Sequence, residues 1–301
     1  MSPRPVPAYA PHDAFAAPAR RRRELWRLFP AGALIGAIYL GLLFLLGTYL
    51  TQTYGPLIAA ALLHRMALGD SPGVMLLLLW TFLGMAAGPI VAVRLIHGRA
   101  AGTLFGPSPR RVLADFRTVA LPVIAMHVLL LPLVLGSADI RPGLSLAAFL
   151  GYLPFALPGL LIQTGAEEIL FRGYLQQQLA ARFARPLVWM GLPSALFALG
   201  HYLPADYGAN AWAVALWAGV FGLLAADLTA RTGSLGAALG LHFANNVSAV
   251  LLVGIAGELD GLALWSRTID LADPGMIGPA LAVDFAVMLI SWLIARIALR
   301  V

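Results

Sequence analysis

Three ionisable side chains stand close together inside an apolar stretch of the sequence. Glu167, Glu168 and Arg172 lie within TGAEEILFRGYL, residues 164–175. Four residues advance an α-helix by slightly more than one turn, so Arg172 shares a helical face with Glu168. A charged residue at the centre of a membrane span costs about 2.5–3.5 kcal/mol on insertion scales. Two glutamates retained at this cost indicate a functional site.

Two further pairs repeat the four-residue spacing on later apolar segments. Phe197 and His201 lie in FALGH, and His242 and Asn246 lie in HFANN. Each pair therefore projects from one helical face. Helical rise places Glu167 and His201 at similar depths, about 22 Å from the inner ends of their helices, and His242 about 13 Å from its own. We expect the three faces to converge on one point if the helix of His242 is tilted or begins lower.

The converging groups admit two kinds of hydrolytic chemistry. A glutamate and a histidine can take a proton from a water molecule, while a second histidine and an asparagine amide stabilise an oxyanion. The same atoms can instead hold Zn²⁺, for which Glu167, His201 and His242 are the candidate ligands. The zinc-protease signature H-E-x-x-H is absent from the sequence. The cofactor is therefore either Zn²⁺ or none.

The composition indicates that lipid is the main solvent of the chain. Of its 301 residues, 60% are hydrophobic and 11% are charged, whereas a soluble domain has about 25% charged residues. The absence of cysteine excludes disulfides and thiolate metal sites. All 20 basic residues are arginines at the ends of apolar runs, which is typical of membrane topology signals and not of a nucleic-acid-binding surface.

Apolar runs of about 20 residues, long enough to cross a bilayer, predict an all-α fold, a polytopic membrane helical bundle with about eight transmembrane helices. The expected spans are 30–50, 73–96, 118–137, 147–170, 187–203, 211–230, 234–256 and 277–298. Pro154 and Pro158 offer a break in the fourth span, whose polar end can continue to Phe183. Residues 1–29 are expected to be a disordered, basic cytoplasmic tail, and residues 30–301 a multi-pass membrane domain.

The arginines orient this predicted bundle. Eight spans place 17 arginines on the side of the N-terminus and only Arg65, Arg141 and Arg267 on the other. The positive-inside rule then puts both termini in the cytoplasm.

Glycines also recur four residues apart within the spans. Gly32 and Gly36 form one such pair, and Gly236 and Gly240 form another. This spacing lets helix backbones approach closely in lipid.

The three motifs E-E-x-x-x-R, F-x-x-x-H and H-x-x-x-N, in this order on successive apolar segments, resemble those of the CPBP intramembrane proteases. This family includes the type II CAAX prenyl endopeptidases and bacterial bacteriocin-processing or immunity proteins. The resemblance covers residues 118–256, which are the expected protease-like core. It implies a helical membrane core with a water-filled cavity that holds the site.

The resemblance also implies a role for each residue of the first two motifs. Glu167 would be the base that activates water, with His201 as its partner. Glu168 would be the second acidic residue of the site. Arg172 would support Glu168, and Phe197 would pack within the site.

In the third motif, the resemblance implies that His242 and Asn246 form the oxyanion hole. The implied function is that of an intramembrane endopeptidase of the CAAX prenyl protease type, which hydrolyses a peptide bond of a membrane-associated substrate. Its partners would be membrane lipid and a peptide or lipidated protein, without nucleic acid. The family is traditionally described as metalloproteases, although the motifs contain no closed zinc signature.

Two other functions fit part of the pattern. A non-catalytic membrane scaffold or immunity protein would keep the fold and lose the activity. A proton-coupled transporter would use the intramembrane carboxylates and histidines as a relay, although no mirrored second half accompanies the prolines of the fourth span. The use of arginine as the only basic residue, with abundant alanine, favours a bacterial source. The expected location is therefore the bacterial cytoplasmic membrane.

Overall fold

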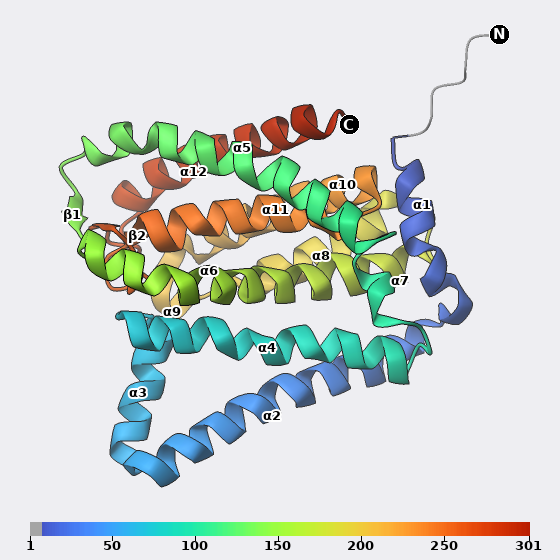
Figure 1. Cartoon of the computed structure of the whole chain (residues 1–301), viewed down its shortest axis with the longest axis horizontal. Coiled ribbons are helices and arrows are strands. Elements are labelled where there is room, and N and C mark those ends of the chain that lie inside the picture. The colour runs from blue at the N-terminus through green and yellow to red at the C-terminus, as the bar shows by residue number, and fades with distance from the viewer. Residues whose placement is uncertain (1–7) are drawn as a thin grey trace.

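The computed structural model describes residues 8–301, with residue 274 described by its backbone alone. It is a bundle of long helices that run back and forth along one axis (Figure 1). The α-helices are α1 (Ala10–Ala16), α2 (Leu28–Tyr54), α3 (Pro56–Leu68), α4 (Pro72–Leu95), α5 (Pro109–Leu135), α6 (Leu146–Glu168), α7 (Gln177–Ala180), α8 (Pro186–Gly200), α9 (Pro204–Tyr207), α10 (Ala211–Thr232), α11 (Leu235–Asn246) and α12 (Pro274–Leu299). Two π-helices, η4 (Ile169–Gln176) and η6 (Val247–Leu252), directly follow α6 and α11. Short 3₁₀-helices are η1 (Ala17–Arg22), η2 (Leu25–Arg27), η3 (Ala101–Leu104) and η5 (Gly208–Asn210).

Capping residues set the ends of the helices that carry the site. Ser145 accepts a hydrogen bond from the backbone N–H of Ala148 and so begins α6. Gly233, with φ of 64°, ends α10 in the left-handed conformation, and Ser234 caps the start of α11. This tight turn makes α10 and α11 neighbours that run in opposite directions.

Within residues 8–301, seven helical segments are long and apolar enough to cross a membrane. They are Leu25–Tyr54, Pro72–Leu95, Ala101–Leu135, Leu146–Ala180, Pro204–Thr232, Leu235–Leu252 and Gly275–Leu299. The prediction of an all-α, polytopic membrane bundle is confirmed. The orientation of its termini stays a prediction.

One expected span is shorter than predicted. The segment 187–203 forms α8, whose 15 residues extend about 22 Å, against a hydrocarbon core of about 30 Å. The helix ends at Gly200, because His201 leaves the helical conformation and Pro204 begins the separate helix α9. In Figure 1, α8 still runs alongside the long helices of the bundle.

The prolines of the fourth span do not break it. Pro154 and Pro158 both lie inside α6. The helical segment continues through η4 and α7 and ends at Ala180, three residues before the expected limit at Phe183. Glu167 and Glu168 therefore have helix both before and after them in the sequence, which fixes the direction of their side chains around the helix axis.

The two glycine pairs differ in what surrounds them. A Cβ atom at Gly236 would collide with the carbonyl oxygen of Val112, and one at Gly240 would lie 2.6 Å from the carbonyl oxygen of Phe116. Close packing of α11 on α5 is thus confirmed. At Gly32 and Gly36 no described atom beyond the neighbouring backbone of the same helix lies within 4 Å of such a Cβ. The prediction of close packing is therefore wrong for this pair.

The expected disorder of residues 1–29 is contradicted where the structure describes them, while residues 1–7 lie outside the described part. Helix α1 packs on α10, and Tyr9 donates a 2.8 Å hydrogen bond to Oδ1 of Asp227. Trp292 on α12 donates to Oδ2 of the same carboxylate at 3.0 Å. Asp227 thus joins three elements at the end of the bundle where α1 and the C-terminal part of α12 lie (Figure 1).

A small sheet joins the loops at the opposite end of the bundle. Its strands are β1 (Ile140–Pro142), β2 (Val253–Ile255) and β3 (Trp265–Arg267), in the order β1-β3-β2. β3 pairs antiparallel with β1 and parallel with β2. Because β2 directly follows η6, the sheet anchors the end of the helix that carries His242 and Asn246.

Candidate active site

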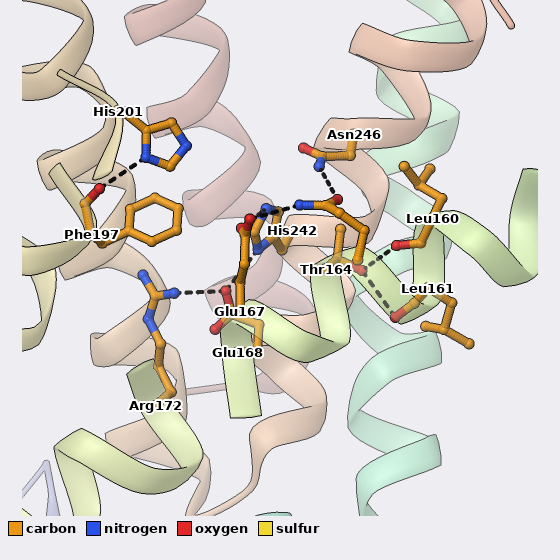
Figure 2. Close-up of polar contacts among 11 residues, drawn as sticks. Leu160, Leu161, Thr164, Glu167, Glu168, Arg172, Phe197, His201, His242 and Asn246 are labelled. Atoms are coloured by element: carbon orange, nitrogen blue, oxygen red, sulfur yellow. Dashed lines mark hydrogen bonds and ion pairs between the residues drawn. The ribbon is translucent and has the colours of Figure 1, made fainter. Parts of the chain in front are cut away.

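Side chains from α6, α8 and α11 meet inside the bundle (Figure 2). The first motif ends α6 and enters η4, the second ends α8, and the third ends α11. The structure thus brings together all seven residues that the sequence predicted, although the three motifs lie far apart in the chain. Their roles in a reaction stay predictions.

Glu168 is the most deeply buried acidic residue of the cluster. Its Oε1 atom accepts a 2.8 Å hydrogen bond from Nη1 of Arg172 and another of 2.8 Å from Nδ1 of His242. Glu168 is 0% exposed and Arg172 1%. The guanidinium carbon also lies 4.9 Å from the centre of the Phe197 ring, a cation–π contact. Arg172 thus pairs with Glu168, and Phe197 packs against Arg172, while the roles that the resemblance implied for them stay predictions.

Glu167 faces the other nitrogen of the same imidazole. Oε2 of Glu167 lies 3.5 Å from Nε2 of His242, and Oε1 accepts a 2.9 Å hydrogen bond from Nε2 of Gln163. His242 therefore lies between the two carboxylates, and Arg172 holds the more buried one. These opposed charges and hydrogen bonds lower the cost of holding four ionisable groups inside a membrane bundle.

His201 is fixed by its own helix. Nδ1 lies 2.8 Å from the carbonyl oxygen of Phe197, and the two rings are 4.4 Å apart. A carbonyl only accepts hydrogen bonds, so Nδ1 carries the proton of the neutral ring and Nε2 is the free basic nitrogen. His201 is half-buried, so this basic nitrogen belongs to a side chain that water can reach.

Gln163 is a site residue that the sequence analysis missed. Its Oε1 accepts a 2.9 Å hydrogen bond from Nδ2 of Asn246, while its Nε2 donates to Glu167. The available signal was its position four residues before Glu167, which places both side chains on one face of α6. Asn246 thus contacts the first motif through Gln163.

The cluster borders a cavity of about 240 Å³. Its polar wall consists of Gln163, Glu167, His201, His242, Asn245 and Asn246. The opposite wall is apolar and includes Met75 and Phe82 of α4 and Trp217 and Phe221 of α10. This volume accommodates water molecules beside the carboxylate of Glu167.

The candidate zinc ligands would have to bind a metal ion through one nitrogen of each imidazole. Nδ1 of His242 is hydrogen-bonded to Glu168 and Nδ1 of His201 to the Phe197 carbonyl, so Nε2 of each ring is the nitrogen that could face a metal ion. Across residues 8–301, no group of three His, Asp or Glu side chains is arranged to hold a metal ion. The candidate set of Glu167, His201 and His242 therefore does not fit zinc in this arrangement.

Both helices that carry the site change to π-helix immediately after it. α6 passes into η4 after Glu168, and α11 passes into η6 after Asn246. The wider turn of a π-helix rotates the following side chains relative to an α-helix, and such segments are frequent at functional sites. Arg172 stands within η4, so this turn sets the direction from which it meets Glu168.

Comparison with known proteins agrees with the geometry. The model of the Rce1-like family, described as type II CAAX prenyl endopeptidase Rce1-like, matches residues 149–248. The uncharacterized protein YyaK of Bacillus subtilis (strain 168) is 35% identical over 103 residues, a segment that spans 33% of each chain. No solved structure matches the chain.

The family match contains the site in full. Residues 149–248 include all three motifs as well as Gln163. The resemblance seen in these motifs is confirmed: residues 149–248 are similar to the Rce1-like type II CAAX prenyl endopeptidases.

Proposed function

We propose that this chain is an intramembrane endopeptidase of the CAAX prenyl protease type, in the cytoplasmic membrane of a bacterium. The observation that carries the proposal is the cavity of about 240 Å³, onto which Glu167, His201, His242 and Asn246 all open. The family match and the helices that can span a membrane support it. The relative from Bacillus subtilis and the arginine-only basic composition support a bacterial location.

In the proposed reaction, water binds in the cavity between Glu167 and Nε2 of His201. Glu167 takes one proton from the water while the water oxygen forms a bond to the peptide carbonyl carbon. The carbonyl oxygen becomes an oxyanion, which accepts hydrogen bonds from the amide of Asn246 and from Nε2 of His242. The C–N bond then breaks, and the proton held by Glu167 passes to the leaving amine.

Glu168 acts in this scheme through His242. Its ionised carboxylate accepts the Nδ1–H of the imidazole, which stabilises a positive charge on the ring. A charged ring is the better donor to the oxyanion. Arg172 keeps Glu168 ionised in its buried position.

The decisive experiment uses purified protein in nanodiscs and a fluorogenic farnesylated CAAX peptide. Wild type is expected to cleave it, and Glu167→Gln to lose at least about 10²-fold in rate while remaining folded. Glu24→Gln is the matched control, because Glu24 is an exposed glutamate paired only with Arg27 near the chain start. Since the candidate ligand set does not fit zinc, a chelator is expected to leave the rate unchanged.

Each result has a distinct meaning. If Glu167→Gln cleaves as fast as wild type, Glu167 is not the base. If the wild type does not cleave the farnesylated peptide but does cleave an unprenylated membrane peptide, the prenyl specificity is wrong and the peptidase class stands. Cleavage of neither peptide would favour the scaffold or immunity function.

A further inference from the structure

The orientation of two amide side chains in the cavity is determined by the groups that they contact. Asn246 and Gln163 each carry an oxygen that only accepts and an NH₂ group that only donates. Rotation of either amide by half a turn exchanges these two ends. An oxyanion is stabilised by the NH₂ end of Asn246 and repelled by its oxygen, so the direction in which this amide points affects the rate.

Glu167 fixes the orientation of Gln163, which in turn fixes that of Asn246. An ionised carboxylate only accepts hydrogen bonds, so it takes the NH₂ end of Gln163, at 2.9 Å. The oxygen of Gln163 must then point away from Glu167. It lies 2.9 Å from Nδ2 of Asn246, so the NH₂ end of Asn246 is directed to Gln163. Each direction follows from the one before it.

We infer that Gln163 is a positioning residue that orients both the base Glu167 and the amide of Asn246. One hydrogen of the Asn246 NH₂ group is taken by Gln163, and the second is left for the cavity that Asn246 lines. The inference rests on the proposed function, because it assigns Asn246 to the oxyanion. Gln163 itself acts through its two neighbours.

The helical framework is suited to this role. Gln163 and Glu167 lie one turn apart on α6, so their relative position is set by the helix. Asn246 ends α11, which is packed against α6, and is 83 residues away in sequence. Gln163 therefore links the helix of the base to the helix of the oxyanion donor. To replace both hydrogen bonds, a side chain at this position must be as long as glutamine and carry both a donor and an acceptor.

The first test is kinetic, with the farnesylated CAAX peptide as substrate. Gln163→Met keeps the size of the side chain and removes both hydrogen bonds. We expect kcat to fall by about 10- to 100-fold, the effect of losing a hydrogen bond to a charged group, with KM changed by no more than about twofold. In an Asn246→Ala background, the same substitution should cost clearly less than in wild type, because its effect through Asn246 is already lost and only its effect through Glu167 remains.

A matched control separates positioning from stability. Gln178 is also buried, but it contacts His97 away from the cavity. Gln178→Met should lower the melting temperature and leave kcat within about twofold of wild type. Additive losses for Gln163→Met and Asn246→Ala, or a loss in Gln163→Met explained by unfolding alone, would overturn the inference.

The second test does not need activity. The chain contains only five glutamines, so ¹⁵N-glutamine labelling gives few side-chain amide signals, and Gln163→Met identifies the relevant one. Glu167→Gln should shift that signal because it removes the charged acceptor, whereas Glu24→Gln should not. Gln163→Met should likewise shift the side-chain amide of Asn246 in ¹⁵N-asparagine-labelled protein. If neither shift occurs, Gln163 does not link Glu167 to Asn246 by hydrogen bonds, and the inference is wrong. If both shifts occur without peptide cleavage, this link stands and the proposed function fails.

Discussion

Glu168 and His242, 74 residues apart in sequence, lie 2.8 Å apart inside the bundle, between Oε1 and Nδ1. The same oxygen is also held by Arg172. Carboxylate, guanidinium and imidazole thus form one buried unit, and removal of the carboxylate or the guanidinium leaves a buried charge without its ion-pair partner. The stability of the site and its chemistry are therefore coupled.

Removing the arginine from this unit should destabilise the protein strongly. Arg172→Met leaves Glu168 buried with only His242 to balance it, and breaking a buried pair in this way costs about 3–5 kcal/mol. The free energy of unfolding, measured by denaturant titration in detergent, should fall accordingly. Glu168→Gln combined with Arg172→Met should recover part of the loss, because it also removes the unpaired charge. If the double variant were less stable than Arg172→Met, an uncompensated charge would not be the cause.

His201 should contribute to the rate and little to stability. His201→Gln removes the basic Nε2, and loss of one acid–base group lowers kcat by about 10²–10⁴-fold. Because the side chain is half-buried, the melting temperature should change little. His127→Gln is the matched control: Nδ1 of His127 bonds to the Val123 carbonyl at 2.9 Å, the same local arrangement, outside the cavity lining. Equal losses of kcat in the two variants would argue against a role for His201.

The two glycine pairs should respond in opposite ways to alanine. Gly236→Ala places a methyl group against the carbonyl oxygen of Val112, and such overpacking costs about 1–3 kcal/mol. Gly36→Ala meets open space and should be neutral or stabilising by up to about 1 kcal/mol, because alanine favours the helix. The melting temperatures of the two variants test this difference: Gly236→Ala should melt below wild type and Gly36→Ala at or above it. A loss at Gly36 equal to that at Gly236 would indicate that a partner covers α2.

Two buried histidines should make stability depend on pH: His12 in the N-terminal segment and His97, which contacts the backbone of Arg22 in that segment. Burial lowers the pKa of His12 and that of His97 from 6.5 to about 4 each. Their neutral forms stabilise the fold fully above pH 6.5, and this contribution is lost as the pH falls from 6.5 towards 4. For His12, which stacks on Trp189, the full loss is of the order of 3 kcal/mol.

A pH series of melting temperatures tests this dependence. His12→Phe keeps the aromatic stacking without a titrating group, so it should remove about half of the fall between pH 6.5 and 4. His64→Gln, at an exposed position, should leave the fall unchanged. A His12→Phe variant as sensitive to acid as wild type would show that His12 is not buried against Trp189.

The residues of the site were predictable because the signals that mark them are local. Charges in an apolar stretch, and partners spaced four residues apart, define a helical face without knowledge of its neighbours. Apolar runs of about 20 residues likewise predicted the class of the fold. Small departures were local as well: α8 is shorter than its apolar run because Pro204 follows it closely.

Contacts between helices were decided only by the tertiary structure. Whether His242 meets one glutamate or both depends on the rotation and depth of α11 relative to α6, which the close approach at Gly236 and the π-helical turns set. The link from Gln163 to Asn246 and the packing of α1 on α10 arise in the same way. The sequence by itself determined which side chains are available and the face on which each lies, since these follow from helical geometry. Which of them meet depends on how whole helices pack, a property of contacts between residues distant in the chain.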